Sequence, residues 1–148
     1  MSSKVDNLVG AVPDAVAMKT YLENHLGVQP SQIHLLLNAQ ATRSAIIQGL
    51  KNLAADRRIK HGDPILFFYA GHGSEVTTPK DWKVDDAKVQ MLLPYDYSSD
   101  GDGLRIHGIP DRTIGTFLSR IAEKKGDNIV RMTINVNNLC AADGIMCL

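Results

Sequence analysis

The chain has 148 residues, long enough for one domain with its own core, and its 16 Lys and Arg balance its 16 Asp and Glu. This zero net charge, without a basic run, argues against nucleic acid or an acidic membrane surface as the main partner, and no apolar segment could span a bilayer. The first residues form no apolar signal core, and two cysteines near the end fit neither a disulfide framework nor zinc spacing, so we expect a reducing, cytoplasmic location.

The first half of the chain alternates helical and strand patterns. From about Asp14 the apolar spacing predicts a helix that ends at Gly27, and residues 33–37 predict a short strand. Thr42 can cap the next helix, and an apolar strand follows over residues 65–70. This alternation predicts an α/β fold with a mostly parallel sheet and helices on both of its faces.

The strand over residues 65–70 ends abruptly in Gly71, His72 and Gly73. In open α/β sheets, ligands and chemistry lie at the carboxyl ends of the strands. The two glycines would allow backbone conformations closed to other residues, and close approach of a substrate. The pattern therefore predicts an imidazole at the rim of the sheet, suited to general acid/base chemistry. A histidine that only caps a turn is the alternative.

The next segment, residues 74–88, is polar with charges of both signs and predicts a long, solvated surface loop. Trp82 lies within it, and we expect it to pack the loop down rather than bind a ligand. Residues 89–93 predict a strand, and a tight turn follows at residues 100–103. The aspartates of that turn suggest a calcium loop, but His107 stands where a bidentate glutamate is needed, so we expect a solvated turn.

The last part of the chain predicts one more helix and one more strand. Asp111 can cap a helix that ends at Gly126. Residues 128–136 then predict a strand, although polar residues dilute its apolar pattern. The tail over residues 137–148 has no clear pattern.

Several segments occur in a recognisable order. They are Asn-Leu-Val-Gly-Ala-Val-Pro-Asp-Ala at 7–15, Ala-Thr-Arg at 41–43, Phe-Phe-Tyr-Ala-Gly-His-Gly-Ser at 67–74, and Leu-Pro-Tyr-Asp at 93–96 followed by Ile-Pro-Asp at 109–111. In this order they resemble the caspase and metacaspase family of cysteine endopeptidases, in its fungal form. The resemblance runs from residue 7 to about residue 129, and its Tyr-Ala-Gly-His-Gly piece is the most specific.

The resemblance implies roles for particular residues. In the family a cysteine thiolate attacks the scissile carbonyl, a histidine protonates the leaving amine and then activates water, and backbone N–H groups hold the oxyanion. His72 is then the general acid/base and Gly73 an oxyanion donor. Asp14 resembles the acidic residue that helps metacaspases accept Arg or Lys before the cut. A helix N-terminal carboxylate favoured by the dipole is an equal alternative for Asp14.

The nucleophile is where the resemblance breaks. The family places its cysteine in an Asp-Cys-Cys-His-Ser-Gly motif at roughly residues 135–136, where this chain has Asn135 and Val136. Cys140 falls within the broad spacing expected after His72, but it lacks the motif, so an incidental thiol is the alternative. A calcium site is doubtful as well, because Pro110 stands where the family often has an aspartate, and we expect no cofactor.

Residues 1–148 are therefore expected to form a partial, large-subunit caspase-like domain, incomplete at both ends. The resemblance implies proteolysis, in apoptosis, of peptide or protein substrates by a hydrolase that lacks its cysteine motif and is impaired. One alternative is a non-catalytic pseudoprotease that self-associates or binds an intact relative through an open sheet edge. Another is an active peptidase that uses Cys140.

Overall fold

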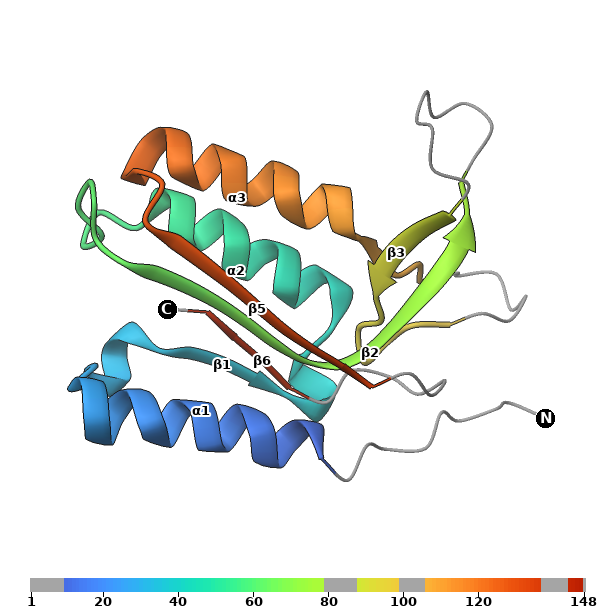
Figure 1. Cartoon of the computed structure of the whole chain (residues 1–148), viewed down its shortest axis with the longest axis horizontal. Coiled ribbons are helices and arrows are strands. Elements are labelled where there is room, and N and C mark those ends of the chain that lie inside the picture. The colour runs from blue at the N-terminus through green and yellow to red at the C-terminus, as the bar shows by residue number, and fades with distance from the viewer. Residues whose placement is uncertain (1–9, 79–87, 99–105, 137–143, 148) are drawn as a thin grey trace.

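The computed structural model describes residues 10–78, 88–98, 106–136 and 144–147. Its elements, in chain order, are α1 (Ala11–Leu26), β1 (His34–Leu37), α2 (Arg43–Ala55), β2 (Ile65–Thr77), β3 (Lys88–Leu92), β4 (Ile109–Pro110), α3 (Asp111–Lys125), β5 (Ile129–Val136) and β6 (Gly144–Cys147). In Figure 1, α2 and α3 cover one face of the sheet and α1 covers the other. The predicted α/β class with helices on both faces is thus confirmed. No helix in the described ranges is long and apolar enough to cross a membrane.

The prediction of a mostly parallel sheet is wrong. Among the described strands only β2 and β5 pair in parallel, and the pairs β1–β6, β2–β6, β2–β3 and β3–β4 are antiparallel. Two features of the chain cause the difference. The patternless tail supplies β6, which runs between β1 and β2 in the opposite direction, and β3 runs back along the far end of β2.

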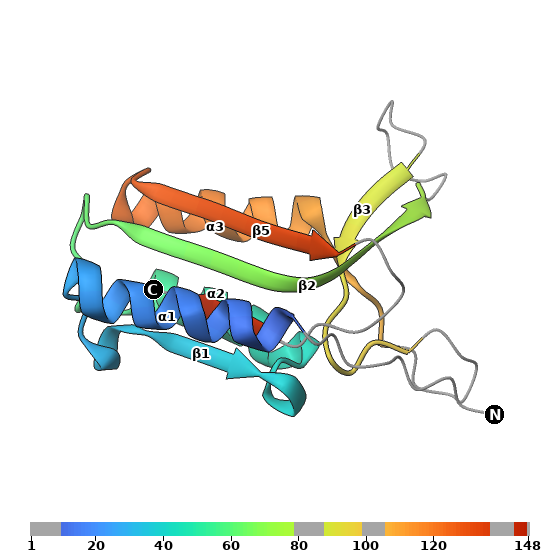
Figure 2. The ribbon, with the colours of Figure 1, turned by 60° about the horizontal axis from the view of Figure 1, so that its bottom comes forward.

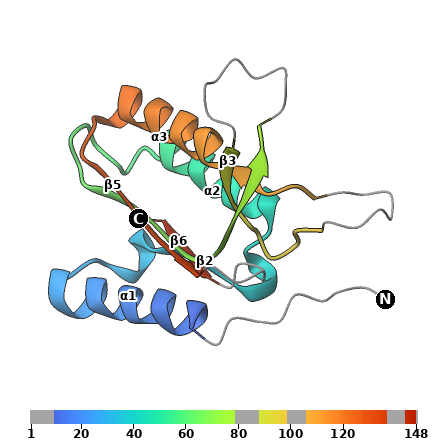
Figure 3. The same cartoon turned by 45° about the vertical axis from the view of Figure 1, so that its right-hand side comes forward.

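The central strand β2 is buried on both faces because its side chains alternate between two cores. Ile65, Phe67 and Tyr69 pack toward α2 and α3. Phe68 and Ala70 pack toward α1, whose contacting residues include small alanines. Figure 3 shows the sheet between these two helical layers.

Two of the predicted helix-capping residues, Thr42 and Gly27, take the positions expected of them, and Asp111 does not. The Thr42 hydroxyl accepts a hydrogen bond from the Ala45 N–H at 3.2 Å, as expected of a capping residue. Gly27 ends α1 with a φ of 68°, the left-handed conformation in which glycine is favoured. Asp111 was predicted to cap α3, but it is the first helical residue, and Pro110 holds the cap position.

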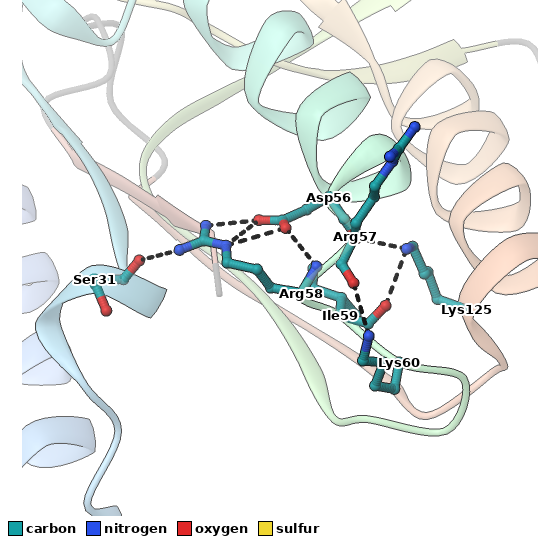
Figure 4. A network of polar contacts seen from close by, with 7 residues as sticks. All are labelled: Ser31, Asp56, Arg57, Arg58, Ile59, Lys60 and Lys125. Atoms are coloured by element: carbon teal, nitrogen blue, oxygen red, sulfur yellow. Dashed lines mark hydrogen bonds and ion pairs between the residues drawn. The ribbon is translucent and has the colours of Figure 1, made fainter.

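A polar network ties the end of α2 to its neighbours (Figure 4). The Arg58 guanidinium contacts the Asp56 carboxylate at 2.6 Å and donates to the Ser31 carbonyl at 3.3 Å. The Lys125 ammonium donates to the carbonyl oxygens of Asp56 at 2.6 Å and Ile59 at 3.0 Å. The Lys125 ammonium thus satisfies the carbonyl of Asp56, the C-cap of α2, and ties α3 to the turn that follows it.

The same network sets the acidity of Asp56. Hydrogen bonds from the side chain and the backbone N–H of Arg58 lower the pKa of this carboxyl from 3.8 to about 2. A carboxyl with a lowered pKa stabilises the folded state above its unfolded pKa. The stabilisation is therefore present above about pH 4 and is lost as the pH falls toward 2.

We predict that an NMR titration of the Asp56 carboxyl carbon has a midpoint near 2. In the Arg58→Gln variant the midpoint should rise toward the ordinary value of 3.8, because the charged donor is gone. Lys19→Gln, which removes an ion pair on α1, serves as the control and should leave the Asp56 midpoint unchanged. A midpoint near 3.8 in the unmodified chain would contradict the described network.

Candidate active site

His72 lies inside β2 rather than at the rim where the sequence predicted it. β2 does not stop at Ala70 but continues through Thr77, because β3 pairs with its last five residues. The residues at 74–77, predicted as loop, are therefore strand. The His72 side chain is 0% exposed, and its Nε2 atom is buried.

Gly71 and Gly73 also differ from their prediction, since both lie in extended strand. In the part of the chain that the structure describes, the glycines with positive φ are Gly27, Gly62 and Gly126. The two glycines beside His72 therefore have ordinary strand conformations and not the unusual backbone conformation that was predicted.

The His72 backbone is held where β2 changes partner. Up to Ala70, β2 pairs with β6, and from Gly73 onward it pairs with β3. Between them, the His72 carbonyl accepts the Leu93 N–H at 3.0 Å and the Tyr69 hydroxyl at 2.6 Å. The Tyr69 hydroxyl also lies 3.1 Å from the Leu93 carbonyl oxygen. Tyr69 therefore fastens β2 to the end of β3 at the histidine.

Sequence reasoning did not assign a role to Tyr69. The available signal was a tyrosine within a run that was otherwise wholly apolar and predicted to be buried. A buried tyrosine hydroxyl needs a hydrogen-bond partner, so such a residue indicates a fixed polar contact inside the core. One of its two partners, the Leu93 carbonyl, lies 24 positions along the chain, and a local pattern cannot reveal it.

The start of α2 is attached to the same place. The Tyr95 N–H donates to the Ala41 carbonyl at 3.0 Å, and the Arg43 N–H donates to a carboxylate oxygen of Asp96 at 2.8 Å. A carboxylate at a helix N-terminus is favoured by the helix dipole. The contacts bring the segments at 41–43, 67–74 and 93–96 together, which explains why these sequence-distant pieces occur as a set.

The end of β5 lies beside His72. The parallel register pairs Asn135 with Gly71 and Val136 with His72. Neighbouring strands are about 4.8 Å apart, and directly paired positions point to the same face. The positions where the resemblance places the family cysteine are therefore next to the histidine in space.

The remaining predicted site residues lie elsewhere or outside the described ranges. Asp14 is exposed in the first turn of α1. Cys140, Trp82 and the turn at 100–103 lie outside the described residues. Across the described ranges, no group of three or more His, Cys, Asp or Glu side chains could hold a metal ion.

A cavity of about 1070 Å³ lies at the opposite end of β2 from His72. Its lining includes His34 of β1, Leu53 of α2 and Ile65 and Leu66 at the start of β2. With about 3.3 Å of rise per residue, Ile65 is roughly 23 Å from His72 along the strand. This cavity is therefore separate from the candidate active site.

A family model described as metacaspase, peptidase C14 domain, matches residues 2–120. The match includes Asp14, His72 and Gly73, and it ends within α3, before β5. Comparisons with curated proteins and with solved structures found no match.

We predict that Tyr69→Phe lowers the free energy of unfolding by about 1 kcal/mol, the usual net value of one buried hydrogen bond. The variant removes the hydroxyl from the carbonyls of both His72 and Leu93, and the His72 carbonyl keeps the Leu93 N–H. Tyr95→Phe removes an exposed hydroxyl and should have no effect. Urea unfolding measures the free energy of unfolding of both variants. Equal losses in Tyr69→Phe and Tyr95→Phe would contradict the role of Tyr69 in fastening β2 to the end of β3.

Proposed function

Because the chain belongs to the metacaspase family of C14 peptidase domains, we propose that it is a caspase-like cysteine endopeptidase domain of impaired activity. The family match covers His72 and Gly73. Beside them, at the positions paired with Gly71 and His72, the chain has Asn135 and Val136, neither of which can act as a thiol nucleophile. The proposal of impaired activity rests on this register of β5 against β2.

In the proposed mechanism a thiolate attacks the carbonyl carbon of the scissile peptide bond. His72 gives its proton to the leaving amine and later takes a proton from the water that releases the acyl group. His72 has no exposed surface, so a substrate can reach its imidazole only when the protein around it opens. The proposed activity is therefore limited by the access of substrate to His72 as well as by the lack of a cysteine beside it.

Gly73 is proposed to donate its N–H to the oxyanion. The His72 carbonyl bonds to Leu93 on the β3 side, and backbone groups of successive strand residues point to opposite edges. The Gly73 N–H is therefore directed away from β3, toward the Val136 end of β5, and that end of the pairing must open before the N–H can meet an oxyanion. Such a donor suits a developing negative charge next to a nucleophile from that strand.

Cys140 is proposed as the substitute nucleophile if the chain cleaves peptides at all. The described strand ends on both sides of residues 137–143 lie at the site, because Val136 pairs with His72 and Gly144 pairs with Ala70. Asp14 is proposed to attract Arg or Lys before the cut, and its exposed carboxylate supports that role. The family resemblance further suggests a cytoplasmic protein that acts in apoptosis.

A non-catalytic module that binds an intact relative is the second candidate. It is favoured by the same observation, since a chain without a nucleophile beside His72 retains the fold but not the reaction. The two candidates differ in whether any histidine-dependent cleavage remains.

The direct test is cleavage of fluorogenic peptides that carry Arg, Lys or Asp before the bond, with and without calcium. We expect weak activity at most, lost in both His72→Ala and Cys140→Ala. His61→Ala, which changes an exposed histidine, is the matched control and should behave as the unmodified chain. Full activity that survives Cys140→Ala would contradict the proposed thiol chemistry, and complete inactivity of the folded chain favours the non-catalytic module.

A second test restores a thiol beside the histidine. We predict that the Val136→Cys thiol, in a Cys140→Ala background, is alkylated by iodoacetamide about tenfold faster at pH 6.5 than in the same chain with His72→Ala. A thiol pKa lowered by about one unit near an imidazolium increases the thiolate fraction by that factor. Equal alkylation rates in the two chains would show that position 136 and His72 do not interact.

A further inference from the structure

Helix α1 covers the face of the sheet on which the His72 side chain lies. Side chains alternate along β2, so His72 is on the same face as Phe68 and Ala70. Both of these pack in the core under α1, together with Ala11 and Ala15 of the helix. The imidazole, which is fully buried, is therefore on the α1 side of the sheet and not under α2 and α3.

The start of α1 reaches the end of the sheet where His72 lies. Towards the other end of the helix, Leu22 lines the same cavity as Leu66, so α1 and β2 run in opposite directions. Ala11 is about 17 Å from Leu22 along the helix, and His72 is about 20 Å from Leu66 along the strand. In Figure 2, the start of α1 lies at the same end of the sheet as the tip of β5, whose last residue pairs with His72. The first turns of α1 are thus the part of this helix nearest to the imidazole.

The first half of α1, residues 11–18, is held to the sheet by little apolar surface. Its fully buried residues are Ala11 and Ala15, and each contributes only one methyl group to the core. Its N-cap residue, Gly10, makes no side-chain hydrogen bond, whereas Thr42 caps α2 through its hydroxyl. The second half is better anchored, because Leu22 is buried and its carbonyl accepts a backbone N–H at the helix end. Local opening of α1 should therefore begin at the end beside His72.

We propose that residues 11–18, which we call the α1 lid, open from the sheet while the rest of the fold stays intact, and that this opening controls access to His72. The larger core is not disturbed, because it lies on the other face of the sheet, under α2 and α3. Weakly held segments beside a reactive group are the usual place for such local opening. The consequence for catalysis rests on the proposed function, whereas the opening itself is measured on the imidazole without any cleavage.

The test is the rate at which diethyl pyrocarbonate modifies His72 in the folded chain, followed by mass spectrometry of its peptides. We expect Ala17→Gly to accelerate this modification about fivefold, because Ala17 is an exposed residue of the lid and glycine disfavours a helix interior by about that factor. Lys51→Gly is the matched control. It weakens α2 at an exposed position on the other side of the sheet and should leave the rate at His72 unchanged.

A second pair of variants tests the opening in the other direction. Val16→Ala replaces an exposed β-branched residue of the lid with the best helix former, so the modification of His72 should become about two- to threefold slower. Thr116→Ala makes the matching change at an exposed position of α3 and should not alter the rate. Because both variants favour their helices, this comparison does not depend on a weakened fold.

The proposal is overturned if Ala17→Gly and Lys51→Gly accelerate the modification equally, because His72 is then reached only by unfolding of the whole chain. It is also overturned if Ala17→Gly and Val16→Ala leave the rate unchanged, or if His72 reacts as fast as the exposed His61 in the unmodified chain. Modification that follows the lid variants in a chain that cleaves no peptide would support the lid and count against the proposed peptidase activity.

Discussion

The constraint on which this structure depends is that one strand, β2, serves two separate sets of partners. Its first half is buried between two helical layers and pairs with β5 and β6, and among the described strands its last residues pair with β3 alone. The change of partner falls at His72. The Tyr69 hydroxyl and the Leu93 N–H both bond to the His72 carbonyl, so the candidate site is also the place where the sheet is fastened together. A substitution at Tyr69 or His72 is therefore expected to disturb the pairing of β2 as well as the candidate site.

Much of the helical part could be predicted because its determinants are local. Thr42 before a helix and Gly27 after one are each recognised within a single turn of chain. Strand pairing depends on residues far apart, and that is where prediction failed. The extension of β2 to Thr77 depends on its pairing with β3. The sequence of β6 has no pattern that predicts a strand or its antiparallel pairing between β1 and β2. Tyr69 was missed for the same reason, because its second contact is made to Leu93.

The candidate site shows the same division. The segments that resemble the family were recognisable in order, and the structure explains them as one contact region around His72, Ala41 and Asp96. The missing cysteine motif stays a prediction from the sequence, and the register of β5 places its expected position beside the histidine, since Val136 pairs with His72. The burial of the imidazole could not be predicted, because it depends on everything packed around the strand. The chain thus combines a histidine that lies within the family match with a closed environment.

The central claim is that His72 is enclosed at the partner change, and imidazole C2 hydrogen exchange measured by mass spectrometry tests it most directly. The chain has five histidines, and His25, His34, His61 and His107 are exposed, so they serve as internal standards. The account predicts that His72 exchanges more slowly than all of these, because solvent must wait for local opening. Exchange of His72 at the rate of the exposed histidines would contradict it and return the imidazole to the rim of the sheet.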